Sequence, residues 1–361
     1  MTFPDHTLTA LLGLSVGDSY GCPFEFNASA TEHSIRSIEE KRYLQCYEDV
    51  KAPIRRCRTS GLGSDDTQQS LILLWGWNQM TEKGKDPLRS DLMAEVFLKV
   101  CQRMAADPSI RQMSAFGLHR GTGRNFREAI SQGKPPDTAG LGAAMRIGPV
   151  ATLIPVQSII PWVIGVSSVT TSNPIALAGA ALFALACWEY VYPEMDITES
   201  LVDSAPKDIQ DAWHLLEEAQ KVLQNKGEKG LLQFASKYTE EDLKCAAGGY
   251  ALTGVPWVLK CVSDATSFED ALLRVCSSGG DTDTVCAMAG CLAALKFGRE
   301  SIPEWMVDGL VGKEHILDPS LWHPIASERP YIIMDRELQA SLEKRFRETD
   351  KQGRISTPKE T

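Results

Sequence analysis

Paired histidines and cysteines of the kind that bind metals are missing from this chain of 361 residues. The six histidines are dispersed, and none forms a paired helical ligand motif. The ten cysteines are scattered without a Cys-x-x-Cys, and Cys187, Cys286 and Cys291 lie in apolar stretches. A histidine-based metal site and a Ser–His triad therefore have little support, and the cysteines are typical of reduced core residues in a cytosolic protein.

Positive charge is also scarce. The chain has 37 Lys and Arg residues against 47 Asp and Glu residues, a net charge of -10. General binding to DNA or RNA depends on clustered basic side chains that meet phosphates, so the composition argues against it. A small anionic ligand would need local help, either from backbone N–H groups or from a metal ion.

A secretory signal and a long uninterrupted apolar run are absent as well. Residues 1–6 lack both the basic start and the apolar core of such a signal, so we expect a cytoplasmic protein. Prolines and Asn173 break the apolar stretch from Ile147 to Tyr190. Its last part, Ile175 to Trp188, is shorter than the roughly 20 residues that a transmembrane helix needs. We therefore predict a buried helix and no membrane partner.

What the sequence does contain is a series of apolar runs with the helical period and few β-type signals, which predicts an all-α fold. The expected helices include Leu8–Val16, Thr67–Met80, Asp91–Met104, Phe126–Ser131, Glu217–Asn225, Glu240–Ala247, Phe268–Cys276 and Thr284–Phe297.

Gly17 and Gly21 are expected to allow tight turns after the first of these runs. We predict one domain over residues 1–336, with residues 27–58 forming an irregular excursion or lid. We also predict that residues 337–361 form a charged tail whose end is frayed.

Two acidic clusters stand out, Gly63-Ser64-Asp65-Asp66-Thr67 and Gly279-Gly280-Asp281-Thr282-Asp283-Thr284. Each places hydroxyls and carboxylates at the start of an apolar helix, and either alone is most simply a helix cap. Together their carboxylates would repel one another, and a bound cation would offset that repulsion. Hard oxygen donors suit Mg²⁺, Mn²⁺ or Ca²⁺ better than zinc, so we predict one divalent-metal site. Glu25, which ends a glycine- and proline-shaped loop, is a further candidate.

Glycine-rich loops supply candidate phosphate donors. Residues 117–125 and 135–142 are rich in small residues, and the first loop precedes a predicted helix. Backbone N–H groups at such a position bind phosphate readily. Arg146, just after the second loop, is more simply a residue that holds the loop by donating to carbonyls.

Four motifs in order resemble the ADP-ribosylglycohydrolases: residues 17–25, 64–67, 142–149 and 279–284. That family includes the dinitrogenase-reductase-activating glycohydrolase and the ADP-ribosylarginine and ADP-ribosylserine hydrolases. The resemblance implies an orthogonally packed all-α domain with two divalent ions, Mg²⁺ or Mn²⁺, at the base of a cleft. It implies metal ligands at Ser64, Asp65, Asp66, Asp281, Asp283 and Thr284. It places Glu25 beside the ribose as a catalytic residue together with Asp65, Asp66 and Asp283, and ADP-ribose contacts at Gly121, Gly123, Thr138 and Gly140.

Two positions depart from the family pattern. Leu141 stands where an Asn is common, and Thr171 stands where a His is usual. Both fall on ligand-contacting positions of the family, so they bear on substrate orientation more than on metal binding.

The resemblance implies a metal-dependent hydrolase that removes ADP-ribose from modified protein side chains, with arginine the favoured site. ADP-ribosyl-serine and O-acetyl-ADP-ribose are alternative substrates. A relative that binds ADP-ribose without turnover, or one that blocks a cognate ADP-ribosyltransferase through residues 27–58, is also consistent with the sequence. An unrelated metal-dependent phosphohydrolase would differ by yielding phosphate or AMP instead of intact ADP-ribose.

Overall fold

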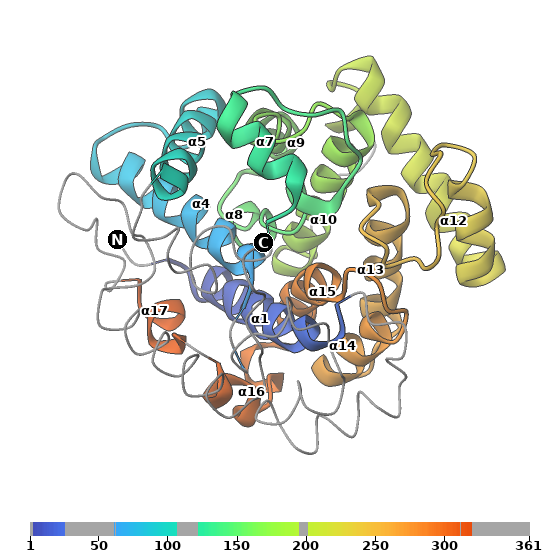
Figure 1. Cartoon of the computed structure of the whole chain (residues 1–361). Coiled ribbons are helices and arrows are strands. Elements are labelled where there is room, and N and C mark those ends of the chain that lie inside the picture. Colours follow the sequence, from blue (N-terminus) through green and yellow to red (C-terminus); the bar gives the residue numbers. More distant parts are fainter. Residues whose placement is uncertain are drawn as a thin grey trace, which may run out of the picture.

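The computed structural model describes residues 3–25, 61, 63–106, 122–194, 201–310 and 312–319. All regular structure within these residues is helical, apart from an isolated bridge between Gly140 and Tyr250 (Figure 1). The all-α prediction is confirmed. The predicted excursion at 27–58, the tail at 337–361 and Gly121 lie outside the described residues.

Except for Glu240–Ala247, each predicted helix lies within a described helix, and most of the described helices are longer than predicted. They are α1 (Asp5–Gly21), α4 (Asp65–Glu82), α5 (Ser90–Ala106), α7 (Arg124–Gln132), α8 (Gly148–Ala151), α9 (Val156–Ser167), α10 (Pro174–Val191), α12 (Lys207–Ala235), α13 (Ala251–Asp264), α14 (Phe268–Cys276), α15 (Thr282–Phe297), α16 (Glu304–Gly309) and α17 (Lys313–Leu317). Short 3-10 turns occupy η1 (Cys22–Phe24), η4 (Leu141–Ala143) and η5 (Arg299–Ser301).

Helices α1 and α15 pack directly against each other at the centre of the fold (Figure 1). A Cβ added to Gly13 would lie 2.2 Å from the carbonyl oxygen of Gly290, and one on Gly17 would lie 1.9 Å from that of Cys286. The predicted tight turns at Gly17 and Gly21 are wrong, because both residues lie within α1. These glycines instead allow two helix backbones to come into contact.

Helix α10 is buried, as predicted, and is longer than the predicted stretch from Ile175 to Trp188. The Asn173 side chain caps it by accepting the N–H of Ile175 at 3.0 Å. With 18 residues and a mean hydropathy of 1.6, it is the one described helix long and apolar enough to cross a membrane. It packs against α9, α12, α13 and α15, and most of its side chains are buried in the core.

The predicted helix Glu240–Ala247 is wrong. Helix α12 kinks at Gly227, where φ is 66°, and after it ends the chain returns to α13 through turns and bends. The backbone of this return segment, residues 236–250, also pairs with distant residues. The carbonyl of Ala247 accepts the N–H of Asp281 at 2.6 Å, and the N–H of Ala251 donates to Ala139 at 2.8 Å.

Candidate active site

The first acidic cluster begins helix α4. Ser64 is the N-cap, since its hydroxyl oxygen accepts the N–H of Asp66 at 3.2 Å. The same hydroxyl donates to the Asp66 carboxylate at 2.7 Å. Asp65 and Asp66 occupy the first turn, where carboxylates interact favourably with the helix dipole, and both are buried. The capping interpretation is therefore correct for Ser64, and its predicted role as a metal ligand stays a prediction.

Asp18 of α1 holds this helix start in place. Its buried carboxylate accepts the backbone N–H of Ser64 at 2.6 Å. It also accepts both the N–H of Thr67, at 3.1 Å, and the Thr67 hydroxyl, at 2.6 Å. Sequence analysis did not single out Asp18 among the candidate residues. The available signal was an acidic residue directly after an apolar helical run.

The second acidic cluster begins helix α15. Gly279 and Gly280 have φ values of 74° and 83°, which L side chains rarely adopt. A Cβ on Gly280 would also lie 2.3 Å from the Ala247 carbonyl oxygen, so glycine is needed there for backbone packing. The Thr282 hydroxyl donates to the Gly21 carbonyl at 2.8 Å, which joins this cluster to the end of α1.

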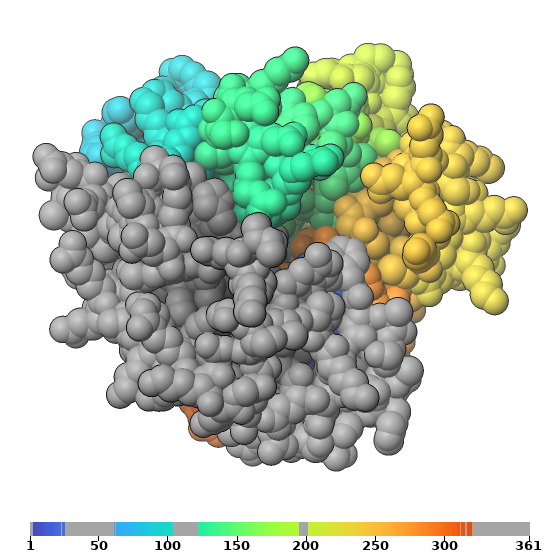
Figure 2. All heavy atoms as spheres, in the orientation of Figure 1, coloured from blue at the N-terminus to red at the C-terminus, as the bar shows by residue number. Residues whose placement is uncertain are grey.

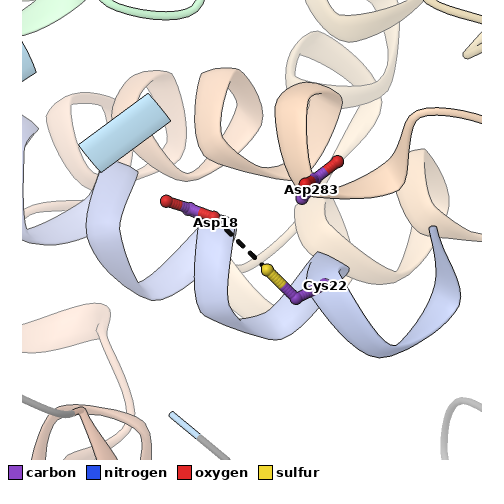
Figure 3. A group of neighbouring side chains, drawn as sticks. All are labelled: Asp18, Cys22 and Asp283. Carbon is purple, nitrogen blue, oxygen red and sulfur yellow. Dashed lines mark hydrogen bonds between the residues drawn. The ribbon is translucent and has the colours of Figure 1, made fainter. Parts of the chain in front are cut away.

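The structure brings acidic side chains from separate parts of the chain together around Asp283. Carboxylate oxygens of Glu25, Asp281 and Asp283 lie within 4.8 Å of one another. Asp18 of α1 and Cys22 of η1 form a second group with Asp283, in which one ligand atom of each residue lies within 4.8 Å of the other two (Figure 3). The Cys22 thiol donates to Asp18 at 3.5 Å, and the Asp18 carboxylate accepts the donors of α4, so we interpret this second group as structural.

A cavity of about 320 Å³ is lined by residues of both acidic clusters and by described residues of the predicted ligand loops. The predicted residues that line it are Glu25, Asp65, Asp66, Gly123, Thr138, Gly140, Asp281, Asp283 and Thr284. In the space-filling view, the orange segment that includes α15 lies at the bottom of a recess bordered by the green and gold segments (Figure 2). Ser64 lies behind this lining, fully buried.

The electrostatics of the cavity floor fit a bound cation. Burial, and then the charges of Asp18, Asp65 and Asp283, raise the pKa of Asp66 well above its ordinary value. Burial, and then the charge of Asp283, raise the pKa of Asp281 in the same way. Within the described part of the chain, the buried Oδ1 atom of Asp66 has no hydrogen-bond partner. Crowded carboxylates, one of them with an unpartnered oxygen, suit a hard divalent ion such as Mg²⁺ or Mn²⁺ when a threonine hydroxyl lies beside them.

The two departures from the family pattern lie on the cavity wall. Leu141 is buried, and its side chain packs against α13, where a Cβ on Gly254 would lie 2.8 Å from the Leu141 Cδ1 atom. The Thr171 hydroxyl donates to the carbonyl of Thr138 at 2.9 Å and accepts the N–H of Asn173 at 3.1 Å. Thr171 thus holds the 135–142 loop in place.

Glu228 is a further residue that sequence analysis missed. It directly follows the kink of α12 at Gly227. One of its carboxylate oxygens accepts the N–H of Ala246 at 2.9 Å and the hydroxyl of Ser278 at 2.6 Å. Glu228 therefore joins the return segment to the loop that precedes Asp281. The Lys226-Gly227-Glu228 turn was visible in the sequence, but nothing in it indicated these distant partners.

Comparison with known proteins agrees with this site. The sequence profile of the family described as ADP-ribosylglycohydrolase matches residues 1–338. An ADP-ribosyl-[dinitrogen reductase] glycohydrolase of Rhodospirillum rubrum is 26% identical over 313 residues, which cover 84% of this chain and 89% of that protein. The uncharacterized protein YegU of Escherichia coli (strain K12) is 30% identical over 323 residues, which cover 82% of this chain and 89% of YegU.

A solved structure described as an ADP-ribosylglycohydrolase-related protein complex has the same fold. It aligns with a TM-score of 0.56 at 21% identity, over 87% of this chain and 94% of its own. The predicted family resemblance is confirmed by the match over nearly the whole chain. The chain belongs to the ADP-ribosylglycohydrolase family and is a hydrolase of that family, whose metal-dependent members act on ADP-ribosylated substrates and release ADP-ribose.

Proposed function

We propose that this protein hydrolyses the bond between ADP-ribose and an arginine side chain of a modified protein, with Mg²⁺ or Mn²⁺ as its cofactor. The observation that carries the proposal is the single cavity in which Glu25, both acidic clusters and the predicted ligand loops meet. A site for a metal alone would not need the adjoining loops. A site for a nucleotide alone would not need so many carboxylates.

The predicted metal ligands are Ser64, Asp65, Asp66, Asp281, Asp283 and Thr284, which supply oxygen donors from the starts of α4 and α15. The pattern of the family suggests two ions. When bound, the ions would offset the carboxylate charge and act as Lewis acids toward the ribose oxygens. The orphaned Asp66 oxygen and the raised pKa values of Asp66 and Asp281 support this assignment.

Glu25 is the proposed proton-transfer residue. It lines the cavity, is half-buried, and has a carboxylate oxygen within 4.8 Å of Asp281 and Asp283 oxygens. Positive charge builds on the ribose ring as a glycosidic bond breaks, and glycosidases use positioned carboxylates at this stage. Glu25 would hold a proton for the departing side chain or accept one from the attacking water.

The predicted ligand loops would receive the pyrophosphate. Gly123 precedes α7, and among the described residues no atom would lie within 4 Å of a Cβ added to it, which leaves room for a ligand on that side of its backbone. N–H groups at the start of a helix bind phosphate without a basic side chain. This would allow a chain of net charge -10 to bind an anionic ligand. Thr138 and Gly140 are proposed to complete this binding site.

Arginine is the favoured linkage for an electrostatic reason. A guanidinium leaving group is cationic over the working pH range, and the carboxylates of the cavity would attract it. A serine hydroxyl or an acetyl group offers no such charge. The relative named as an ADP-ribosyl-[dinitrogen reductase] glycohydrolase is consistent with a protein-linked substrate.

A comparison of three substrates tests the proposal. Proteins carrying ADP-ribose on arginine or on serine, and O-acetyl-ADP-ribose, would each be incubated with the protein, with Mg²⁺ or with EDTA. We expect release of ADP-ribose to be fastest from arginine and to stop in EDTA. Faster release from serine or from the acetyl ester would contradict the arginine assignment, and activity in EDTA would contradict the metal assignment.

A further inference from the structure

Arg146 is a buried cation beside the acidic site. Its side chain is 0% exposed, although it borders the cavity. Its guanidinium donates to the side-chain oxygen of Gln69 at 2.8 Å, to the Gly142 carbonyl at 2.8 Å and to the Thr170 hydroxyl at 2.6 Å. All these acceptors are neutral. Burial lowers the pKa of Arg146 to about 10, so the protein maintains this charge at an energetic cost.

Gln69 joins Arg146 to the first acidic cluster. It lies one turn after Asp65 in α4 and is fully buried. Its amide Nε2 donates to the Asp65 Oδ2 atom at 2.7 Å, while its Oε1 accepts from Arg146. A side-chain amide has one donor end and one acceptor end of nearly the same shape. Only its neighbours decide which end faces which way.

Arg146 settles the orientation of that amide. A guanidinium can donate hydrogen bonds but cannot accept them, so the oxygen of Gln69 must face Arg146. The amide nitrogen must then face Asp65. The Phe97 ring, whose centroid is 4.8 Å from the Arg146 Cζ atom, and the Thr170 hydroxyl keep the guanidinium in place.

We propose that Gln69 and Arg146 are positioning residues that orient the Asp65 carboxylate for the divalent cation, with Arg146 acting through Gln69. This inference rests on the proposed function, because it needs Asp65 to be a metal ligand. Neither side chain is assigned contact with the ion or with the substrate. Outer-sphere partners of this kind keep a ligand in its binding orientation and typically change metal affinity about 10–100-fold when they are removed.

The hydrogen-bonded chain from Arg146 through Gln69 to Asp65, called the relay below, also explains why the site tolerates a buried arginine with neutral partners. Asp65 is close enough for its negative charge to favour the charged form of Arg146. Arg146 in turn donates to the carbonyl of Gly142, the last residue of the 135–142 loop. The Arg146 guanidinium thereby connects helix α4, through Gln69, with that loop.

Calorimetric titration of the full chain with MgCl₂ or MnCl₂ alone tests the relay. The variants are Gln69→Met, Arg146→Lys and the double variant, with Gln79→Met as the matched control. Gln79 is buried in the same helix but donates to Glu82, away from the cavity. Thermal melts at increasing Mg²⁺ concentration provide a second readout.

We expect Gln69→Met and Arg146→Lys each to weaken metal binding by about tenfold or more. The metal affinity of the double variant should be within about threefold of the affinity of the more weakly binding single variant. The reason is that the effects of two residues in one hydrogen-bond network do not add. Saturating Mg²⁺ should restore the full thermal shift, and Gln79→Met should bind as the natural chain does.

A folded Gln69→Met variant with unchanged metal affinity would overturn the relay, even if Arg146→Lys does not fold. If the fold-losses of metal affinity of the two single variants multiply in the double variant, the two residues act independently. That result would overturn the claim that Arg146 acts through Gln69. If the natural chain binds neither ion, the metal site of the proposed function fails and the relay fails with it.

Discussion

The carboxylate of Asp18 accepts the backbone N–H of Ser64 at 2.6 Å, although the two residues are 46 positions apart in the sequence. Asp18 belongs to α1, and Ser64 is the N-cap of α4. The end of α1 also contacts the start of α15, where the Thr282 hydroxyl donates to the Gly21 carbonyl. One helix therefore aligns the two acidic clusters, and the geometry of the site depends on it.

Replacing Asp18 with Asn should destabilise the protein. The amide oxygen can replace Oδ2, which accepts the three donors at the start of α4. The amide NH₂ group would then lie where Oδ1 accepts the N–H of Ser64 at 2.8 Å and the Cys22 thiol at 3.5 Å, so it would face two buried donors. We expect the free energy of unfolding to fall by about 2–3 kcal/mol in urea denaturation. Asp5→Asn, at the exposed start of the same helix, should cost less than about 1 kcal/mol. Equal losses in the two variants would contradict the role assigned to Asp18.

The fold class, and several of the residues that line the cavity, could be predicted from the sequence for a physical reason. The periodic spacing of apolar residues indicates a helix. Hydroxyls and carboxylates at the start of a helix also form a local pattern that can be read from the sequence. Phe268–Cys276 was predicted with its observed bounds, and residues of both acidic clusters line one cavity.

What the sequence did not predict depends on distant partners. Gly17 looked like a turn residue, because nothing local shows that its missing side chain makes room for the Cys286 carbonyl. Hydrogen bonds to residues far away in the sequence determine the roles of Asp18, Gln69 and Glu228. The segment from Glu240 to Ala247 looked helical, because the sequence does not show that the Ala247 carbonyl accepts the N–H of Asp281.

Replacing Gly17 with Ala should separate α1 from α15. The new Cβ would lie 1.9 Å from the Cys286 carbonyl oxygen, so the backbones must move apart. We expect a loss of about 1–3 kcal/mol in unfolding free energy, despite the higher helix propensity of Ala. Mg²⁺ should also bind more weakly, since the clusters would shift.

Gly179→Ala in α10 is the matched control for Gly17→Ala. A Cβ there would meet side-chain methyl groups at 3.3 Å and 3.5 Å, which can adjust. Its unfolding free energy should change by less than about 1 kcal/mol. A Gly17→Ala variant as stable as Gly179→Ala would show that the two helices do not need their close contact.

Replacing Glu228 with Ala should loosen the loop before Asp281. The buried N–H of Ala246 and the hydroxyl of Ser278 would lose their shared acceptor, at a cost of about 1–3 kcal/mol. Glu228→Gln should cost less, because both bonds go to a single oxygen that an amide retains. Hydrogen exchange of residues 245–250 and 277–281 measures the loosening directly. Glu218→Ala, on the exposed face of α12, should leave exchange unchanged.

The metal-free protein should lose stability as the pH rises. The pKa values of Asp66 and Asp281 are raised well above the ordinary 3.8, mainly by burial, so the folded chain binds more protons than the unfolded chain above that pH. Its unfolding free energy therefore falls until these groups are ionised.

Added Mg²⁺ should stabilise the protein more strongly as the pH rises, because metal ions bind the deprotonated carboxylates. Melting curves with EDTA or Mg²⁺ across pH 5 to about 8 measure both trends. A stabilisation by Mg²⁺ that is largest at the lowest pH would contradict the assignment of these carboxylates as ligands.

The two acidic clusters are proposed to form one metal site, at which the protein hydrolyses its substrate and releases intact ADP-ribose. The most direct measurement follows the products from an ADP-ribosyl-arginine protein by mass spectrometry, with Mg²⁺, for the natural chain, Asp65→Asn and Asp283→Asn. We predict intact ADP-ribose from the natural chain and a loss of about 100-fold or more in kcat/KM for each variant, one from each cluster. Release of AMP or phosphate, or full activity in either variant, would contradict the account.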